Sequence, residues 1–296
     1  MIDTIKKWTK RYVPESYILK LLQAKMKLSL FPPDIFLGMI RLLPQDKLVY
    51  LKERIQCVGR LDYPHKDIYM KVDSLIQISR LDACKKEPET INWIESQVKP
   101  GDVFYDIGAN VGAYSFVAWA VASGDCTVYA FEPSFSTYAA LSHNIMINHC
   151  QEKVVSLQLI LSDETNLVAL NYSQVTPGAA SHSLGETVGG NGQRFIPEFT
   201  QFIPSYRLDD IINQFNLRIP NHIKIDVDGA EYAVLQGGIE TLTHPDLHSV
   251  LVEIDEERYP HGEIPSLMVS KGFRLVARHL RPGSTTLANC IFEKRE

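Results

Sequence analysis

The sequence feature that most constrains the fold is a regular alternation of short apolar segments with helical segments, which begins near residue 87. Five segments read as strands: 103–107, 127–133, 154–162, 222–228 and 248–255. Segments with helical periodicity lie around them: 88–98, 113–122, 135–149, 208–215, 230–238 and 264–272. This alternation predicts a parallel β-sheet wrapped by helices. The closing segments 273–280 and 286–294 predict a hairpin that adds an antiparallel strand.

Composition and charge narrow the classes of protein. Of 296 residues, 45% are hydrophobic and 22% are charged, which is sufficient for a globular domain with a sizeable core. The formal net charge of −5 argues against nucleic acid as a partner. Five cysteines without a C-x-x-C pair predict no disulfide framework and no zinc site, and favour a reducing, cytoplasmic location.

The N-terminal part differs from the rest in charge. Residues 1–60 contain twelve Lys and Arg against five Asp and Glu. The apolar side chains Ile18, Leu21, Leu22 and Met26 follow a helical spacing. We interpret residues 1–84 as a basic helical extension of a main domain, 85–296. The extension is expected to pack on that domain, and weak contact with a membrane surface is the alternative.

The N-terminal sequence contains no apolar run typical of a signal peptide. The most apolar early stretch, 28–44, is interrupted by prolines and charges, so it is too short to span a bilayer. A second unusual segment is 173–200, which contains five glycines and many polar residues. Long loops inside a compact domain are often functional, so we expect a lid or substrate loop there.

The turn after the first strand, "DIGANVG", is typical of a ligand site at the carboxyl edge of a parallel sheet. Gly108 and Gly112 let the backbone approach a ligand. The turn lacks the G-x-G-x-x-G pattern of dinucleotide sites, because Asn110 takes the second glycine's place. Asp106 precedes the turn, and its carboxylate favours a cationic ligand group over a pyrophosphate. An NAD-dependent oxidoreductase is therefore disfavoured.

Acidic residues also follow the next two strands. Glu132 ends the second strand and is placed to accept hydrogen bonds from ribose hydroxyls. Ser162 and Asp163 end the third, where they are expected beside an adenine ring. A ribose clamp and a carboxylate for an amine, without a diphosphate cradle, describe S-adenosylmethionine.

The block "HIKIDVDGAE" supplies the candidates for catalysis. Alternation places Lys224, Asp226 and Asp228 on one face of a continuing strand. Asp226 is the first candidate, either to hold the methionine amine, to bind the acceptor or to act as a base. Glu231 is the second, although an acidic residue at a helix start also has a purely electrostatic explanation.

Two further candidates lie elsewhere. His182 in the 173–200 loop is a catalytic candidate because histidine titrates near neutral pH, and an ordinary loop histidine is the alternative. Glu253 ends the fifth strand at the same sheet edge. Mg²⁺ prefers oxygen ligands, which Asp226, Asp228, Glu231 and Glu253 could together supply, but no metal is expected.

Taken together, "PGDVFYDIGANVGAYS", "VYAFEPS", "LSDE" and "IKIDVDGAEYAVLQGG" resemble the FkbM-type S-adenosylmethionine-dependent methyltransferases over about residues 85–296. The resemblance implies a Rossmann-like class I methyltransferase fold with seven strands, mostly parallel, and an antiparallel last strand. It also implies S-adenosyl-L-methionine as methyl donor and a hydroxyl of a saccharide or secondary metabolite as acceptor.

Carried over by position, the resemblance implies a set of cofactor-binding residues: Asp106, Gly108, Ala109, Asn110, Gly112, Glu132, Pro133, Ser162, Asp163 and Asp226. Asp228 stands where the family usually has Glu, which shortens the reach of the acid. The alternative function is a catalytically inactive module that keeps the ligand site and docks through its basic N-terminal part.

Overall fold

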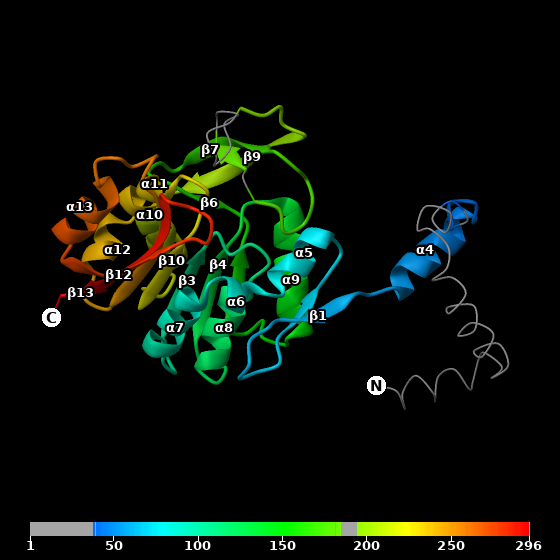
Figure 1. The fold of residues 1–296 in the computed structure, drawn as a ribbon, viewed down its shortest axis with the longest axis horizontal. Coiled ribbons are helices and arrows are strands. Elements are labelled where there is room, and N and C mark those ends of the chain that lie inside the picture. The colour runs from blue at the N-terminus through cyan, green and yellow to red at the C-terminus, as the bar shows by residue number, and fades with distance from the viewer. Residues whose placement is uncertain (1–37, 39, 181, 185–193, 296) are drawn as a thin grey trace. The chain divides into compact units, whose positions relative to one another are not determined.

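The structure of the chain is a computed structural model that describes residues 38, 40–180, 182–184 and 194–295 (Figure 1). The chain divides into two compact units, Met1–Gln56 and Cys57–Glu296. Helix α4 (Gln45–Arg54) belongs to the first unit. The expected helix around residues 18–26 lies outside the described residues. The expected boundary at 84/85 does not coincide with the observed division, because residues 57–84 belong to the same unit as the main sheet.

A seven-stranded sheet forms the centre of the second unit, in the order β12-β13-β11-β10-β3-β4-β5. Its strands are β3 (Val103–Ile107), β4 (Thr127–Phe131), β5 (Val154–Leu157), β10 (His222–Ile225), β11 (Ser249–Asp255), β12 (Phe273–Leu280) and β13 (Leu287–Lys294). Strands β5, β4, β3, β10 and β11 pair in parallel, and β13 pairs antiparallel to both β11 and β12. The predicted α/β fold with an antiparallel last strand is confirmed.

Helices cover both faces of this sheet (Figure 1). On one face pack α7 (Pro88–Gln97), α8 (Ala113–Val121) and α9 (Phe135–Ile147). On the other pack α10 (Leu208–Phe215), α11 (Glu231–Gly237), α12 (Ile239–Thr243) and α13 (Glu263–Ser270). The alternation of strand side chains explains the two layers: Phe104 packs with the first group, while Tyr105 packs with the second. No helix among the described residues is long and apolar enough to cross a membrane.

The sequence predicts a helical extension up to residue 84, but residues 57–86 are not purely helical. They form β1 (Val58–Arg60) paired antiparallel with β2 (Tyr69–Lys71), then α5 (Leu75–Arg80) and α6 (Ala83–Lys86). Leu61, Tyr63, Ile68 and Met70 are buried in the same core cluster as α8 and α9. This segment is therefore an integral part of the domain that contains the main sheet.

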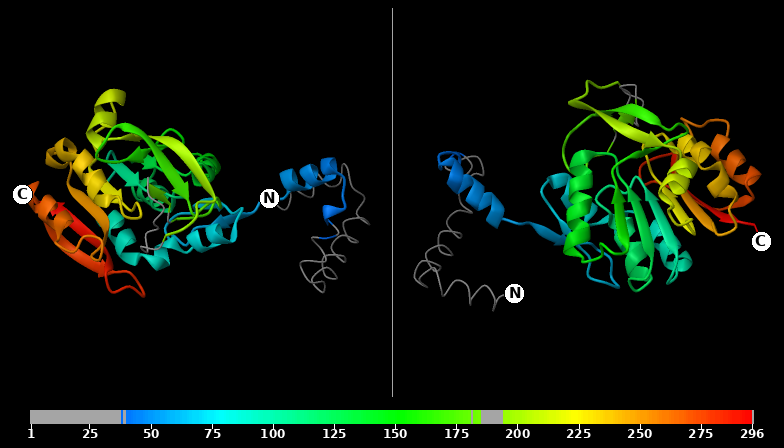
Figure 2. Two further views of the ribbon diagram at one scale, coloured as in Figure 1. Left: turned by 90° about the horizontal axis from the view of Figure 1, so that it is seen from above. Right: turned by 180° about the vertical axis from the view of Figure 1, so that it is seen from behind.

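A second, four-stranded sheet of order β6-β9-β7-β8 lies beyond one end of the main sheet (Figures 1 and 2). Its strands are β6 (Ile160–Leu161), β7 (Asn166–Tyr172), β8 (Ser183–Leu184) and β9 (Phe199–Tyr206). Strand β9 was not predicted. The segment expected as a loop, 173–200, thus contains β8 and the first residues of β9.

Three predicted strands end earlier than expected, and the first of them, 127–133, ends at Phe131. The segment 154–162 breaks after Leu157. The N–H of Glu132 donates to the carbonyl of Leu157, and the next residue, Pro133, has no N–H with which to continue the pairing. Ile160 and Leu161 instead pair with β9. The segment 222–228 leaves the strand after Ile225, so the prediction of one continuing strand to Asp228 is wrong.

Candidate active site

The site lies where the chain order of the sheet reverses, between the carboxyl ends of β3 and β10, as expected for an open parallel sheet. Gly108, directly after β3, has φ of 83°. A Cβ atom at this position would lie 1.8 Å from the carbonyl oxygen of Asp226, so only glycine allows the two strand ends to approach so closely.

The second strand supplies Glu132, whose buried carboxylate lines the pocket. Its Oε2 accepts the N–H of Asn110 at 2.9 Å and its Oε1 accepts the N–H of Ser134 at 2.9 Å. Burial raises the pKa of Glu132 to about 7, although both N–H groups stabilise its ionised form. These contacts fix the carboxylate at the pocket wall.

A buried ammonium joins the ends of β3 and β10. Lys224 Nζ lies 2.9 Å from Asp226 Oδ2 and 3.8 Å from Asp106 Oδ1. The Ser115 hydroxyl donates to Asp106 Oδ2 at 2.6 Å, and the ring of Tyr114 lies 4.9 Å from Lys224 Nζ. The sequence pattern predicts only that Lys224 lies on the same strand face as Asp226, and it indicates no role for Lys224.

Lys224 and burial act differently on the two acids of this cluster. Burial acts to raise the pKa of Asp226, but the ammonium of Lys224 outweighs it and lowers that pKa. Burial raises the pKa of Asp106, and Lys224 opposes that shift. Asp226, the acid of this pair that lines the pocket, is thus held in its ionised form, which favours a cationic ligand group beside it.

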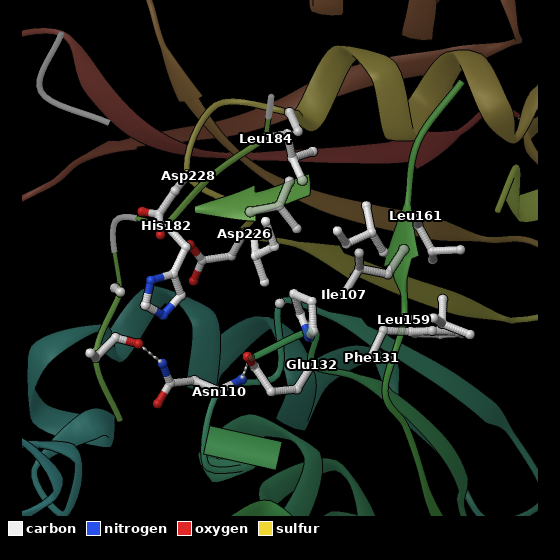
Figure 3. A pocket seen from close by; sticks show the side chains of 18 of the residues that line it. Ile107, Asn110, Phe131, Glu132, Leu159, Leu161, His182, Leu184, Asp226 and Asp228 are labelled. Atoms are coloured by element: carbon white, nitrogen blue, oxygen red, sulfur yellow. Dashed lines mark hydrogen bonds between the residues drawn. The ribbon is translucent and has the colours of Figure 1, made fainter. Parts of the chain in front are cut away.

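The pocket is open and has one apolar and one polar side (Figure 3). Its empty space, counted together with open solvent at the mouth, is about 840 Å³. The apolar lining consists of Ile107, Phe131, Leu159, Ile160, Leu161, Leu170 and Leu184. The charged and hydrogen-bonding lining consists of Arg80, Asn110, Glu132, His182, Asp226 and Asp228.

His182 reaches the pocket from the segment just before β8. Its ring centroid lies 4.7 Å from that of Tyr172. Both imidazole nitrogens are buried, and neither has a hydrogen-bond partner within the described part of the chain. Burial lowers the pKa of His182, which favours the neutral imidazole.

The structure brings six of the predicted site residues to the pocket surface: Gly108, Asn110, Glu132, Pro133, His182 and Asp226. Asp106, Ala109 and Gly112 are not among the lining residues. Ala109 and Gly112 shape the turn behind the pocket, and Asp106 acts on it through Lys224.

Ser162 and Asp163 also lie outside the pocket lining, and the Ser162 hydroxyl donates to Asp163 at 3.0 Å. The apolar residues 159–161, just before them, face the pocket instead. The sequence signal for this wall is the apolar run "LIL", which is part of the predicted strand 154–162. Arg80 was also missed, because α5 precedes every recognised motif.

Glu231 and Glu253 have partners away from the pocket. Glu231 accepts the N–H of Gly229 at 2.8 Å, consistent with its role at the start of α11. Glu253 Oε1 lies 3.0 Å from Arg281 Nε, and burial raises the pKa of Glu253 to about 9. Across the described residues, no group of three or more His, Cys, Asp or Glu is arranged to hold a metal ion.

The sheet order, the antiparallel last strand and a pocket bounded by the β3 turn and Glu132 define the class of Rossmann-like methyltransferases. A sequence model of the "Methyltransferase FkbM domain" matches residues 106–275, more than half of the chain. The chain belongs to the FkbM methyltransferase family and is a methyltransferase.

Similar proteins include methyltransferases with named acceptors. The 31-O-demethyl-FK506 methyltransferase FkbM of Streptomyces tacrolimicus is 29% identical over 201 residues, which cover 61% of this chain and 76% of that protein. The hexuronic acid methyltransferase AglP of Haloferax volcanii is 25% identical over 184 residues, covering 62% and 68%. Among solved structures, Methyltransferase FkbM from Methylobacillus flagellatus aligns with a TM-score of 0.48 at 12% identity, over 71% of this chain and 60% of that one.

Proposed function

We propose that this chain transfers a methyl group from S-adenosyl-L-methionine to a hydroxyl group of a saccharide or secondary metabolite. One observation carries the proposal. A single pocket contains the Glu132 carboxylate, an apolar wall and the Asp226 carboxylate beside Lys224. These features match the three parts of the donor: a ribose, a flat base and a cationic amino-acid end.

The pocket residues fit the donor part by part. The Glu132 carboxylate accepts hydrogen bonds from ribose hydroxyls. The apolar segment 159–161 offers the surface for the adenine ring. Asp226, ionised and at the pocket surface, attracts the ammonium group. When bound, the donor supplies a methyl group that is already activated by its sulfonium.

The protein's remaining task is to orient the acceptor hydroxyl and to take up its proton. Asp226 is a weak base, because Lys224 holds its pKa below the ordinary value. His182, a pocket-lining residue, combines a neutral imidazole with two nitrogens that have no hydrogen-bond partner among the described residues. We therefore assign proton removal to His182 and ligand orientation to Asp226. Glu231 has no direct role in this scheme.

The hydroxyl acceptor is supported by the names of the two relatives, one a methyltransferase of 31-O-demethyl-FK506 and one of hexuronic acid. We place the reaction in a reducing, cytoplasmic setting, which the five free thiols support.

Calorimetric titration with S-adenosylhomocysteine and, separately, with NAD tests the donor. We expect binding of S-adenosylhomocysteine alone, and Glu132→Ala should weaken it about tenfold or more, because charge-assisted hydrogen bonds to ribose are lost. Glu152→Ala removes an exposed carboxylate away from the pocket and is the matched control. Absence of binding by folded wild-type protein would refute the proposed donor and favour a docking role.

A further inference from the structure

Arg80 is the last residue of α5 and lines the pocket together with Asp226. Helix α5 begins with a complete capping box: the Ser74 hydroxyl accepts the N–H of Gln77 at 3.1 Å, and Gln77 Oε1 accepts the N–H of Ser74 at 3.0 Å. The start of this short helix is therefore held in place. The family match begins only at residue 106, so Arg80 comes from outside the matched region.

The Arg80 guanidinium is fixed from one side only. Its Nε and Nη2 atoms donate to the carbonyl oxygen of Gly178, at 3.2 and 2.9 Å. Within the described chain, the guanidinium forms no ion pair within 4.0 Å, although it is near enough to the Asp226 carboxylate to help lower the pKa of that group. A guanidinium has five N–H donors, so three remain available for a ligand.

The backbone that holds Arg80 is itself anchored. The Ser74 hydroxyl donates to the carbonyl of Pro177 at 2.8 Å, and the N–H of Gly178 donates to Thr137 Oγ1 at 3.2 Å. Asn110 Nδ2, from the turn after β3, donates to the carbonyl of Ala179 at 3.2 Å. The guanidinium is thus presented to the pocket by a preorganised wall, which lowers the entropic cost of binding an anion.

We propose that Arg80 is a carboxylate-binding residue of the pocket. The inference rests on the proposed function, which supplies two sources of this group: the amino-acid end of the methyl donor, or an acidic acceptor such as a uronic acid. Arginine matches a carboxylate through two parallel N–H···O bonds, and no protein acid among the described residues occupies that position. Arg80 and Asp226 would together bind groups of opposite charge.

Two ligands that differ by the amino-acid end test the first source. Titrations of wild type and Arg80→Gln use S-adenosylhomocysteine and 5′-methylthioadenosine, which lacks the carboxylate. If Arg80 binds the donor, Arg80→Gln lowers the affinity for S-adenosylhomocysteine about tenfold or more. Its affinity for 5′-methylthioadenosine stays within about twofold of wild type. Arg80→Lys should recover part of the loss, because it keeps the charge without the fork.

Ser74→Ala is the matched structural control. It removes a bond to the same wall without removing a charge. If a substitution only loosens the wall, the binding of both ligands should weaken by the same factor. Loss of a carboxylate contact should weaken only the binding of the ligand that has a carboxylate. Equal weakening of both ligands in Arg80→Gln would therefore contradict a direct contact with the donor.

A second pair of probes tests the acceptor as the source. Protein saturated with S-adenosylhomocysteine is titrated with D-glucuronate and with D-glucose, which differ in the carboxylate. If Arg80 binds the acceptor, wild type prefers glucuronate and Arg80→Gln loses the preference. The inference is overturned if Arg80→Gln changes neither donor affinity nor this preference while wild type binds S-adenosylhomocysteine. Failure of wild type to bind S-adenosylhomocysteine would instead refute the proposed function.

Discussion

At the scale of single residues, His182 and Asp226 line one pocket but hold protons differently. Lys224 keeps Asp226 ionised, so its negative charge is permanent near neutral pH. His182 has no charged partner within the described residues, and burial keeps it neutral. A permanent charge suits binding, whereas a neutral imidazole suits proton removal.

The pKa of His182 gives the first residue-scale prediction. The neutral imidazole accepts the proton, so activity should persist below about pH 6.5, the ordinary value for histidine, and fall as pH drops through the lowered pKa. NMR titration of the imidazole signals, assigned by their loss in His182→Gln, measures that pKa. The acid limb of kcat/KM, which reports the free enzyme, should have the same midpoint, and His182→Gln should lower kcat by about 10²–10⁴.

An observation of the opposite kind would contradict the assignment. If His182 titrates above about pH 6.5, or if His182→Gln raises KM while kcat is unchanged, His182 binds the acceptor without removing its proton. Tyr259→Phe provides a control, because its hydroxyl contacts Glu231 and not the pocket. It should leave the acid limb of the profile in place.

The residue-scale predictions from sequence were best where a side chain directly ends a strand. Glu132 and Asp226 were expected at the site, and both line the pocket. Arg80 was not foreseen, because a long side chain on a short helix carries no local signal of what it faces. For Ser162 and Asp163, the chain turns away before reaching them, and their predicted role beside adenine remains a prediction.

At the scale of elements, the turn between β3 and α8 decides whether the site forms. We expect Gly108→Ala to destabilise the protein by clearly more than Gly101→Ala. Both glycines have positive φ, 83° and 90°, so the backbone strain of about 1–2 kcal/mol is shared. Only at position 108 would the new Cβ atom collide with backbone, and overpacking adds about 1–3 kcal/mol.

Denaturant unfolding and S-adenosylhomocysteine titration of the two variants measure the difference. Gly101 has open space around its Cβ direction, so its variant should bind the ligand like wild type. Equal losses of stability at both positions would show that the ends of β3 and β10 can separate without cost. In that case the close approach at Gly108 would not be needed for the site.

Among the elements, the main sheet followed from hydrophobic alternation, but the small sheet did not. Strand β9 contains Pro204 and exposes Phe202, so its pattern resembles neither a buried strand nor a regular amphipathic one. It is stabilised by pairing with β7 along seven residues, from Asn166–Ser205 to Tyr172–Phe199. Such distant partners are not visible in a local sequence pattern.

At the scale of the whole molecule, residues 57–84 decide where the functional unit begins. A chain that starts at Cys57 keeps every lining residue of the pocket and should bind S-adenosylhomocysteine within about twofold of the full chain. A chain that starts at residue 85 loses Arg80 and four buried apolar side chains: Leu61, Tyr63, Ile68 and Met70.

The expected result is that the shorter chain fails to fold stably. Burial of each large apolar side chain contributes about 1.5–3 kcal/mol, so four contribute about 6–12 kcal/mol. That is comparable to the typical total stability of about 5–15 kcal/mol. Thermal unfolding of both truncated chains provides the measurement. A cooperative transition and full ligand binding by the chain from residue 85 would restore the boundary expected from sequence.

The sequence by itself determined the alternation of strands and helices, the antiparallel closing hairpin and the acidic residues at the strand ends. These follow from periodicity and turn chemistry, which act over a few residues. Only the tertiary structure decided that Lys224 bridges Asp106 and Asp226, that residues 159–161 form the apolar wall, and that Arg80 enters the pocket. The physical reason is that strand pairing and buried charge networks join residues far apart in the chain, and their energies depend on distances that no local pattern encodes.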